Sequence, residues 1–214
     1  LFEIAPFVRF WLARIGTAAA NQMHSVAVAW QVYQLTGSAL DLGLVGLFQF
    51  LPRIFLTATA GNMADSHDRK RIAAWAQVVQ AAVLCALLLL TLGHAIDRRA
   101  IFALVAVSGA ARTFEMPATS SLLATLVPAR LLTKAVALNA SAIQAAFIVG
   151  PALAGLLYAF GDALVYGVTL ALFAAAAAAF GSIPSPAEPR QPIAGSEWEK
   201  FIDGLRFIRG QRVV

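Results

Sequence analysis

The feature that most constrains the fold is a series of long apolar stretches without any charged residue. Residues 15–40, 72–96, 135–161 and 163–187 contain no Asp, Glu, Lys or Arg. About 20 mostly apolar residues are enough to cross the hydrocarbon core of a bilayer as a helix. A soluble domain carries roughly a quarter charged residues, whereas this chain carries 13%. The sequence therefore predicts an integral membrane protein of the all-α class.

Two further stretches are long enough to span a bilayer but contain charged residues. The stretch 42–64 includes Arg53, and the stretch 100–129 includes Arg112 and Glu115. Both can insert if these charges face the protein interior rather than lipid. The sequence thus predicts a bundle of six transmembrane helices over residues 1–183, at about 10–34, 40–61, 72–94, 100–123, 134–159 and 162–183.

The character of the sequence changes after the sixth predicted helix. Residues 184–196 are rich in proline, which predicts an extended linker. Residues 197–214 place apolar side chains at helical spacing between charges, which is typical of an amphipathic helix at a membrane surface. The chain begins without methionine and stops inside this segment, so we expect both ends to be truncated.

The basic residues predict the orientation, because Lys and Arg concentrate in cytoplasmic loops. Most of the 16 basic residues lie at the two ends of the chain or in alternate connections: Arg9, Arg14, Arg69, Lys70, Arg71, Arg130, Lys134, Arg190, Lys200, Arg206, Arg209 and Arg212. The opposite connections hold only Arg98 and Arg99. We therefore expect both ends to be cytoplasmic. The scatter of these residues argues against a nucleic-acid partner.

A stripe of polar residues crosses the first predicted helix. Asn21, His24 and Gln31 fall within about 80° of arc around the helix axis. A polar stripe on a spanning helix faces the bundle interior. Lining of a transport cavity is the preferred interpretation, and hydrogen bonding between helices is the alternative. His24, His67 and His94 belong to different depths, so no metal site is expected.

Three charged residues lie inside predicted helices. Arg112 and Glu115 are three residues apart, so they can pair on one helix. Glu115 is either the proton carrier of a transport cycle or half of a structural pair. Arg53 either lines a cavity and attracts an anionic substrate or reaches toward the headgroups; the second interpretation, or a structural pairing, is preferred.

The predicted connection between helices two and three carries a patterned run. It reads Gly61-Asn62-Met63-Ala64-Asp65-Ser66-His67-Asp68-Arg69-Lys70-Arg71. Gly61 is expected to end a helix at a close packing contact. The Asp65 carboxylate can dock on the positive N-terminus of a neighbouring helix, while the basic triplet meets anionic headgroups. An ordinary cytoplasmic loop with an incidental aspartate is the alternative.

The spacing Gly-x-x-x-Asp-x-x-x-Arg-Lys-Arg resembles motif A of the major facilitator superfamily. Ser66 and Asp68 depart from that motif, where a basic residue and a glycine are usual. In the superfamily this loop latches two six-helix halves together in one state of the transport cycle. The resemblance implies that Asp65 is the latch carboxylate and Arg69 its charge partner, with the partner helix in a second half.

Other stretches are similar to the same superfamily. Gly150-Pro151-Ala152-Leu153-Ala154-Gly155 in the fifth helix resembles the exporter motif C. There Pro151 removes a backbone donor, and Gly150 and Gly155 permit close helix contact. Together with residues 35–38 and 111–118, nearly the whole chain resembles the transmembrane secretion effector branch, which includes siderophore exporters of the enterobactin type and drug exporters.

This resemblance implies the N-terminal half of a twelve-helix transporter, built from two inverted three-helix repeats. The expected function is export of a small molecule by alternating access, coupled to proton re-entry. No cofactor is expected, because the sequence has no Gly-x-x-x-x-Gly-Lys-Ser/Thr loop for ATP. The expected partners are the substrate, the bilayer and a C-terminal six-helix half.

The sequence has to be weighed against two other classes of protein. An intramembrane enzyme needs a catalytic set that faces one cavity, and the only close aspartates, Asp65 and Asp68, lie in a predicted loop. An enzyme is therefore not expected. A non-transporting scaffold or sensor on the same fold is the second alternative, and it could lack the mid-membrane polar residues of a second half.

Overall fold

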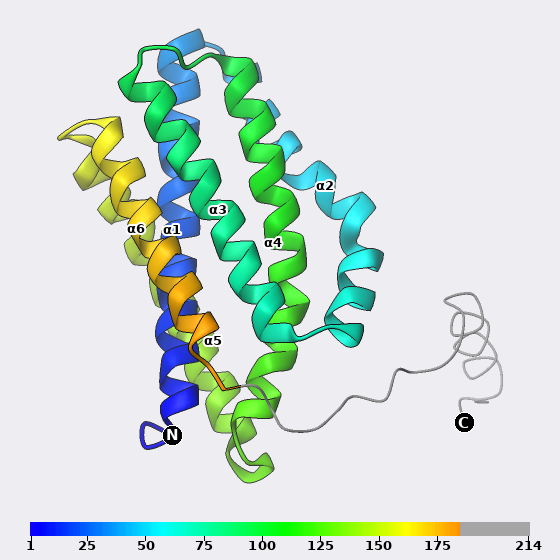
Figure 1. Ribbon diagram of the computed structural model, residues 1–214. Coiled ribbons are helices and arrows are strands. Elements are labelled where there is room, and N and C mark those ends of the chain that lie inside the picture. The colour runs from blue at the N-terminus through cyan, green and yellow to red at the C-terminus, as the bar shows by residue number, and fades with distance from the viewer. Residues whose placement is uncertain (185–214) are drawn as a thin grey trace, which may run out of the picture.

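The computed structural model describes residues 1–184, and this part of the chain forms a bundle of six α-helices (Figure 1). The helices are α1 (Ala5–Thr36), α2 (Ala39–Ser66), α3 (Arg69–Leu92), α4 (Arg98–Leu126), α5 (Ala129–Tyr158) and α6 (Asp162–Gly181). The expected all-α, six-helix class is confirmed. The segment 197–214 and all but the first residue of the segment 184–196 lie outside the described residues.

Five of the helices, α2 to α6, are long and apolar enough to cross a membrane. The first helix has 32 residues and is the longest of the six, yet it is not apolar enough to be counted with these five. Its polar side chains explain the difference, and Thr17, Asn21, His24 and Gln31 are buried against the other helices. A polar spanning helix is tolerated where its neighbours shield it from lipid.

Several helices extend past their predicted ends. The apolar stretch marks only the hydrocarbon-length part of a helix, whereas backbone hydrogen bonding continues into the charged interface. The second helix runs to Ser66 and the fifth begins at Ala129. Ser38, Asp68 and Asp97 are N-cap residues whose side chains accept hydrogen bonds from the first-turn N–H groups of α2, α3 and α4.

Helix packing follows a pattern that relates the first three helices to the last three. The helix α1 packs extensively on α5 and α6, and α4 packs in the same way on α2 and α3. Exchanging α1 with α4, α2 with α5 and α3 with α6 maps each of these contacts onto another. The remaining extensive contact, between α3 and α6, maps onto itself. This exchange is the relation that two three-helix repeats would produce.

The interior contains two apolar clusters at different depths along the bundle. One surrounds Met23, Leu84, Tyr166 and Phe173, among others. The other is built around residues near the start of α1 and the end of α6, where the rings of Phe10 and Phe180 meet edge to face at 6.0 Å. The residues of α1, α3 and α4 that lie between these two clusters in sequence include buried polar and charged side chains. This polar layer positions the candidate site.

Candidate functional site

The centre of the polar layer is a buried carboxylate with partners on two other helices. Glu115 of α4 forms an ion pair with Arg14 of α1, with 2.7 Å between Nη1 and Oε1. Its other carboxylate oxygen accepts a hydrogen bond from Nε2 of Gln80 on α3 at 3.2 Å. A second cross-helix bond runs from Thr17 Oγ1 to Gln77 Oε1 at 3.1 Å. Three helices are thus joined around one carboxylate.

The partner of Glu115 differs from the one that spacing suggested. Arg112 was the expected partner, but the ion pair in the structure joins Glu115 to Arg14, which is 101 residues away in sequence. The Glu115 side chain meets α1 and α3, whereas Arg112 lines a cavity beside α2. The sequence interpretation treated Arg14 only as a basic residue of the cytoplasmic side. Its position one residue before the charge-free stretch 15–40 was the available signal.

The polar stripe on α1 serves different contacts along its length. Gln31 donates from Nε2 to Thr91 Oγ1 at 3.0 Å and to Asp162 Oδ2 at 3.2 Å. Its Oε1 accepts a hydrogen bond from the hydroxyl of Tyr166 at 2.6 Å. Gln31 therefore joins α1 to α3 and α6, as the alternative interpretation of the stripe describes. Asn21 Oδ1 and His24 Nε2 are buried without a hydrogen-bond partner among residues 1–184.

A polar cavity lies between α2 and α4. It has a volume of about 320 Å³ and is lined by Gly46, Gln49, Phe50, Arg53, Gly109 and Arg112. The two arginines lie near the middle of their helices. A ligand site combines apolar walls with a few converging polar groups, and this cavity has both. The structure thus brings Arg53 and Arg112 together on one cavity, and Glu115 is not among the residues that line it.

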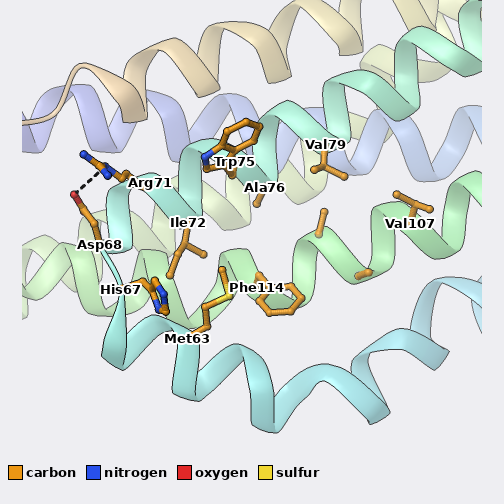
Figure 2. A pocket seen from close by; sticks show the side chains of 12 residues that line it. Met63, His67, Asp68, Arg71, Ile72, Trp75, Ala76, Val79, Val107 and Phe114 are labelled. Carbon is orange, nitrogen blue, oxygen red and sulfur yellow. Dashed lines mark ion pairs between the residues drawn. The ribbon is translucent and has the colours of Figure 1, made fainter. Parts of the chain in front are cut away.

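A second hollow is mainly apolar. A groove of about 530 Å³ lies between α2, α3 and α4, and Figure 2 shows the side chains of Ile72, Val79, Val107 and Phe114 along it. Its polar end is formed by the α2–α3 connection, where Asp68 and Arg71 form an ion pair at 3.8 Å. The groove lacks converging polar groups along its depth, so the polar cavity is the better candidate for substrate contact.

The motif A-like loop is tied to the bundle by its basic residues. Arg69 donates to the backbone carbonyl of Ser121 on α4 at 3.1 Å. Lys70 donates to the carbonyl of Ile183 at 2.9 Å, just past the end of α6. The Asp65 carboxylate is exposed to solvent in residues 1–184, so it is accessible to a partner. The latch role of Asp65 and Arg69 stays a prediction.

The expectation for Gly61 is wrong. This glycine does not end a helix, because α2 continues to Ser66. A Cβ atom added at Gly61 would meet nothing within 4 Å in the described part of the chain. The next helix begins instead after Asp68, whose side chain caps the backbone N–H of Lys70 at 3.1 Å. The aspartate that departs from motif A thus acts as the N-cap of α3.

The two glycines of the motif C-like stretch have different surroundings. A Cβ atom at Gly150 would lie 2.6 Å from the Cβ of Gln22 and 3.3 Å from the carbonyl oxygen of Ala19, both on α1. At Gly155 it would meet nothing within 4 Å among the described residues. Gly150 therefore allows a close helix contact, as the sequence predicted, and the structure shows that the partner is α1. The same expectation for Gly155 finds no such contact among the described residues.

Substitution of these two glycines tests that difference. The Gly150→Ala variant is expected to lower the free energy of unfolding by about 1–3 kcal/mol, because the added methyl overlaps α1. The Gly155→Ala variant is its matched control in the same helix, and we expect it to be neutral or slightly stabilising. Thermal unfolding of the purified full-length protein in detergent measures both. Equal loss of stability in the two variants would contradict the packing at Gly150.

Comparison with known proteins gives consistent matches over nearly the whole chain. The model of a family described as "Transmembrane secretion effector" matches residues 2–214. The macrolide efflux protein A of Streptococcus pyogenes is 24% identical over 206 residues, which cover 95% of this chain and 51% of that protein. The multidrug efflux pump Tap of Mycolicibacterium fortuitum is 26% identical over 213 residues, covering 95% of this chain and 52% of that protein. The chain spans about half the length of these curated relatives.

Proposed function

The chain belongs to the transmembrane secretion effector family of the major facilitator superfamily, and we propose that the protein exports small molecules by proton-coupled alternating access. The observation that carries this proposal is the buried Arg14–Glu115–Gln80 cluster, which places an ionisable carboxylate between three helices of the bundle. The relatives named as efflux proteins support the direction of transport.

The proposal includes a second six-helix half that completes the transport pathway. Among the five helices that are apolar enough to span a membrane, α2 and α5 are the least covered by the rest of the chain. Only 11% of the residues in the most apolar segment of α2 and 17% of those in α5 are buried. Large apolar side chains such as Phe55 on α2 and Ile148 on α5 are exposed. Packing of the second half against these two helices would bury this surface and close the polar cavity into a binding site between the halves.

Proton coupling would act through the contacts of Glu115. The ionised carboxylate attracts Arg14 and so links α4 to α1. Protonation of Glu115 would remove its negative charge and weaken this link, because the attraction between two opposite charges would be replaced by a hydrogen bond in which only the guanidinium is charged. A proton that enters from outside could in this way loosen one helix contact and favour the opposite state of the transporter. Protonation would thus change the relative stability of the two states of the transporter, which any coupling mechanism requires.

Export by the full-length protein in proteoliposomes tests the proposal. The protein is reconstituted, a pH gradient is imposed, and movement of a radiolabelled macrolide and of two naphthylamine dyes is followed. We expect movement that depends on the gradient and stops when an ionophore collapses it. If no compound moves under any gradient, the transport function is contradicted. Movement that ignores the ionophore would contradict proton coupling alone.

The proposed orientation, with the α2–α3 connection in the cytoplasm, follows from the basic residues of that side. In a full-length background without other cysteines, a cysteine at His67 is expected to react with a membrane-impermeant maleimide only in opened cells. A cysteine at Arg99, at the other end of the bundle, is the matched control and should react in intact cells. The reverse pattern of labelling would show that the orientation is inverted.

A further inference from the structure

The residues that line the polar cavity between α2 and α4 indicate what kind of chemical group it can bind. We propose that it binds a negatively charged group of the transported molecule, so that an organic anion such as a carboxylate, phenolate or sulfonate is a favoured substrate. The inference rests on the proposed export function and adds a substrate class to it. It is carried by the two arginines on the cavity wall, neither of which forms an ion pair among the described residues.

The shape of the cavity is built into the two helices. Gly46, Gln49, Phe50 and Arg53 recur at spacings of three and four residues, so they share one face of α2. A Cβ atom at Gly109 of α4 would overlap the backbone carbonyl of Gln49, so the helices touch at this level. This backbone contact holds Gln49 at the cavity, which Arg53 and Arg112 also line.

Neither arginine of the cavity forms an ion pair within residues 1–184. Arg53 lies beside two neutral groups, with its Nη2 3.7 Å from the sulfur of Met116 and its guanidinium carbon 6.0 Å from the centre of the Phe50 ring. The charged groups that act on Arg112 are Glu115 and Arg53. Glu115 is already engaged by Arg14 at 2.7 Å. The cavity wall therefore carries two positive charges and no carboxylate.

Two guanidinium groups in this position favour an anion for two reasons. A charge near the middle of a membrane-spanning helix is costly unless it faces a wet cavity or an opposite charge. The two like charges also repel each other, and this repulsion is stronger than in bulk water because Arg112 is partly buried. An anion with two or more oxygens can accept hydrogen bonds from both guanidiniums at once, with the Gln49 amide as a further donor.

The size of the cavity limits what this part of the site contacts. A volume of about 320 Å³ lies at the lower end of the range for small-molecule sites. It can hold a charged group with an attached ring against Phe50, while the remainder of a larger substrate extends toward the second half. The inferred site thus selects for one charged group and leaves the rest of the molecule variable.

A pair of dyes that differ by one charged group provides the test. Anilinonaphthalene sulfonate is an anion, and phenylnaphthylamine is its uncharged parent. Binding to the purified full-length protein and export from proteoliposomes are measured for both dyes, using the wild type and the variants Arg53→Gln and Arg112→Gln. Each substitution is expected to weaken sulfonate binding by roughly tenfold or more, since it removes a charged hydrogen-bond donor. Binding of the parent dye should change less than about twofold on the same reasoning.

The controls separate an effect on the cavity from an effect on folding. Arg99→Gln makes the same substitution at an exposed position at the end of the bundle and is expected to leave both dyes unaffected. Arg53→Lys keeps the charge and should retain part of the preference for the sulfonate, because lysine supplies one charged group without the planar fork. Thermal unfolding of every variant shows whether the protein is intact.

Several results would overturn the inference while leaving export itself in place. One is export of both dyes at equal rates that do not respond to either arginine substitution. Another is a loss of thermal stability in both variants with an unchanged ratio of sulfonate to parent-dye binding, which would show that carboxylates of the second half pair with these arginines. Binding of the sulfonate that depends on the arginines, without export of any compound, would contradict the transport function and support the anion site.

Discussion

The Glu115→Gln variant of the full-length protein is expected to lose export driven by a pH gradient and to unfold more easily. The substitution leaves Arg14 without its negative partner inside the bundle, where its side chain is only 17% exposed. Breaking one side of a buried ion pair costs roughly 3 kcal/mol, the lower end of the usual range. Two readouts follow: the free energy of unfolding and the rate of gradient-driven export.

The double variant Arg14→Gln/Glu115→Gln separates these two effects. Neither side chain is then charged, so most of the lost stability should return. Export driven by the gradient should not return, because the carboxylate that would bind the proton is still absent. Full export by the double variant would eliminate Glu115 as the proton carrier. A single variant as stable as the wild type would contradict the ion pair itself.

Arg71→Gln is the matched control for stability. It removes an arginine from the ion pair with Asp68 that lies at the end of the bundle, where the Arg71 side chain is 79% exposed. Exposed pairs contribute little, and the expected change is within about 0.5 kcal/mol. Comparison of the two arginine–carboxylate pairs by thermal unfolding shows how much the buried position contributes.

The Gly109→Ala variant is expected to produce the second large effect. A methyl group at this position overlaps the backbone carbonyl of Gln49, and backbone atoms cannot turn aside as a flexible side chain can. The helices α2 and α4 must separate, at a cost of about 1–3 kcal/mol. Over most of this range, the cost exceeds the gain of roughly 1 kcal/mol that alanine brings to a helix interior. The substitution should also weaken anion binding, since it moves the cavity walls apart.

Gly43→Ala is the control for this prediction. Gly43 lies in α2, and a Cβ atom there would meet nothing within 4 Å in the described structure. We expect unchanged or slightly raised stability, because only the helix propensity changes. The midpoint of thermal unfolding measures both variants. A Gly109→Ala protein that is as stable as Gly43→Ala would show that the two helices do not touch at this level.

The six helices and the family could be predicted because both depend on patterns local to the sequence. A charge-free stretch long enough to cross the hydrocarbon core can be recognised without any knowledge of its neighbours. The family that the motifs predicted is the one that matches residues 2–214. The ends of the helices were harder to predict from the sequence. The caps Ser38, Asp68 and Asp97 act through single hydrogen bonds, which change a boundary without changing the hydropathy.

The glycines show where local patterns stop being informative. Gly61 and Gly150 both belong to motif-like stretches, yet only Gly150 meets a neighbouring helix among the described residues. Gly109 belongs to neither stretch, and among the glycines of residues 1–184 it makes the closest approach to another helix. A glycine is required where another backbone passes, and that neighbour comes from a distant part of the chain.

The sequence by itself determined that this is a six-helix integral membrane protein of a transporter family, because hydropathy and motif spacing are properties of short segments. Only the tertiary structure decided which partner each intramembrane polar group has. It paired Glu115 with Arg14, placed Gln31 between α3 and α6, and left Arg53 and Arg112 together on one cavity. The physical reason is that the energy of a charge in a membrane depends on its nearest neighbours in space, and helix packing brings these neighbours from distant segments of the chain.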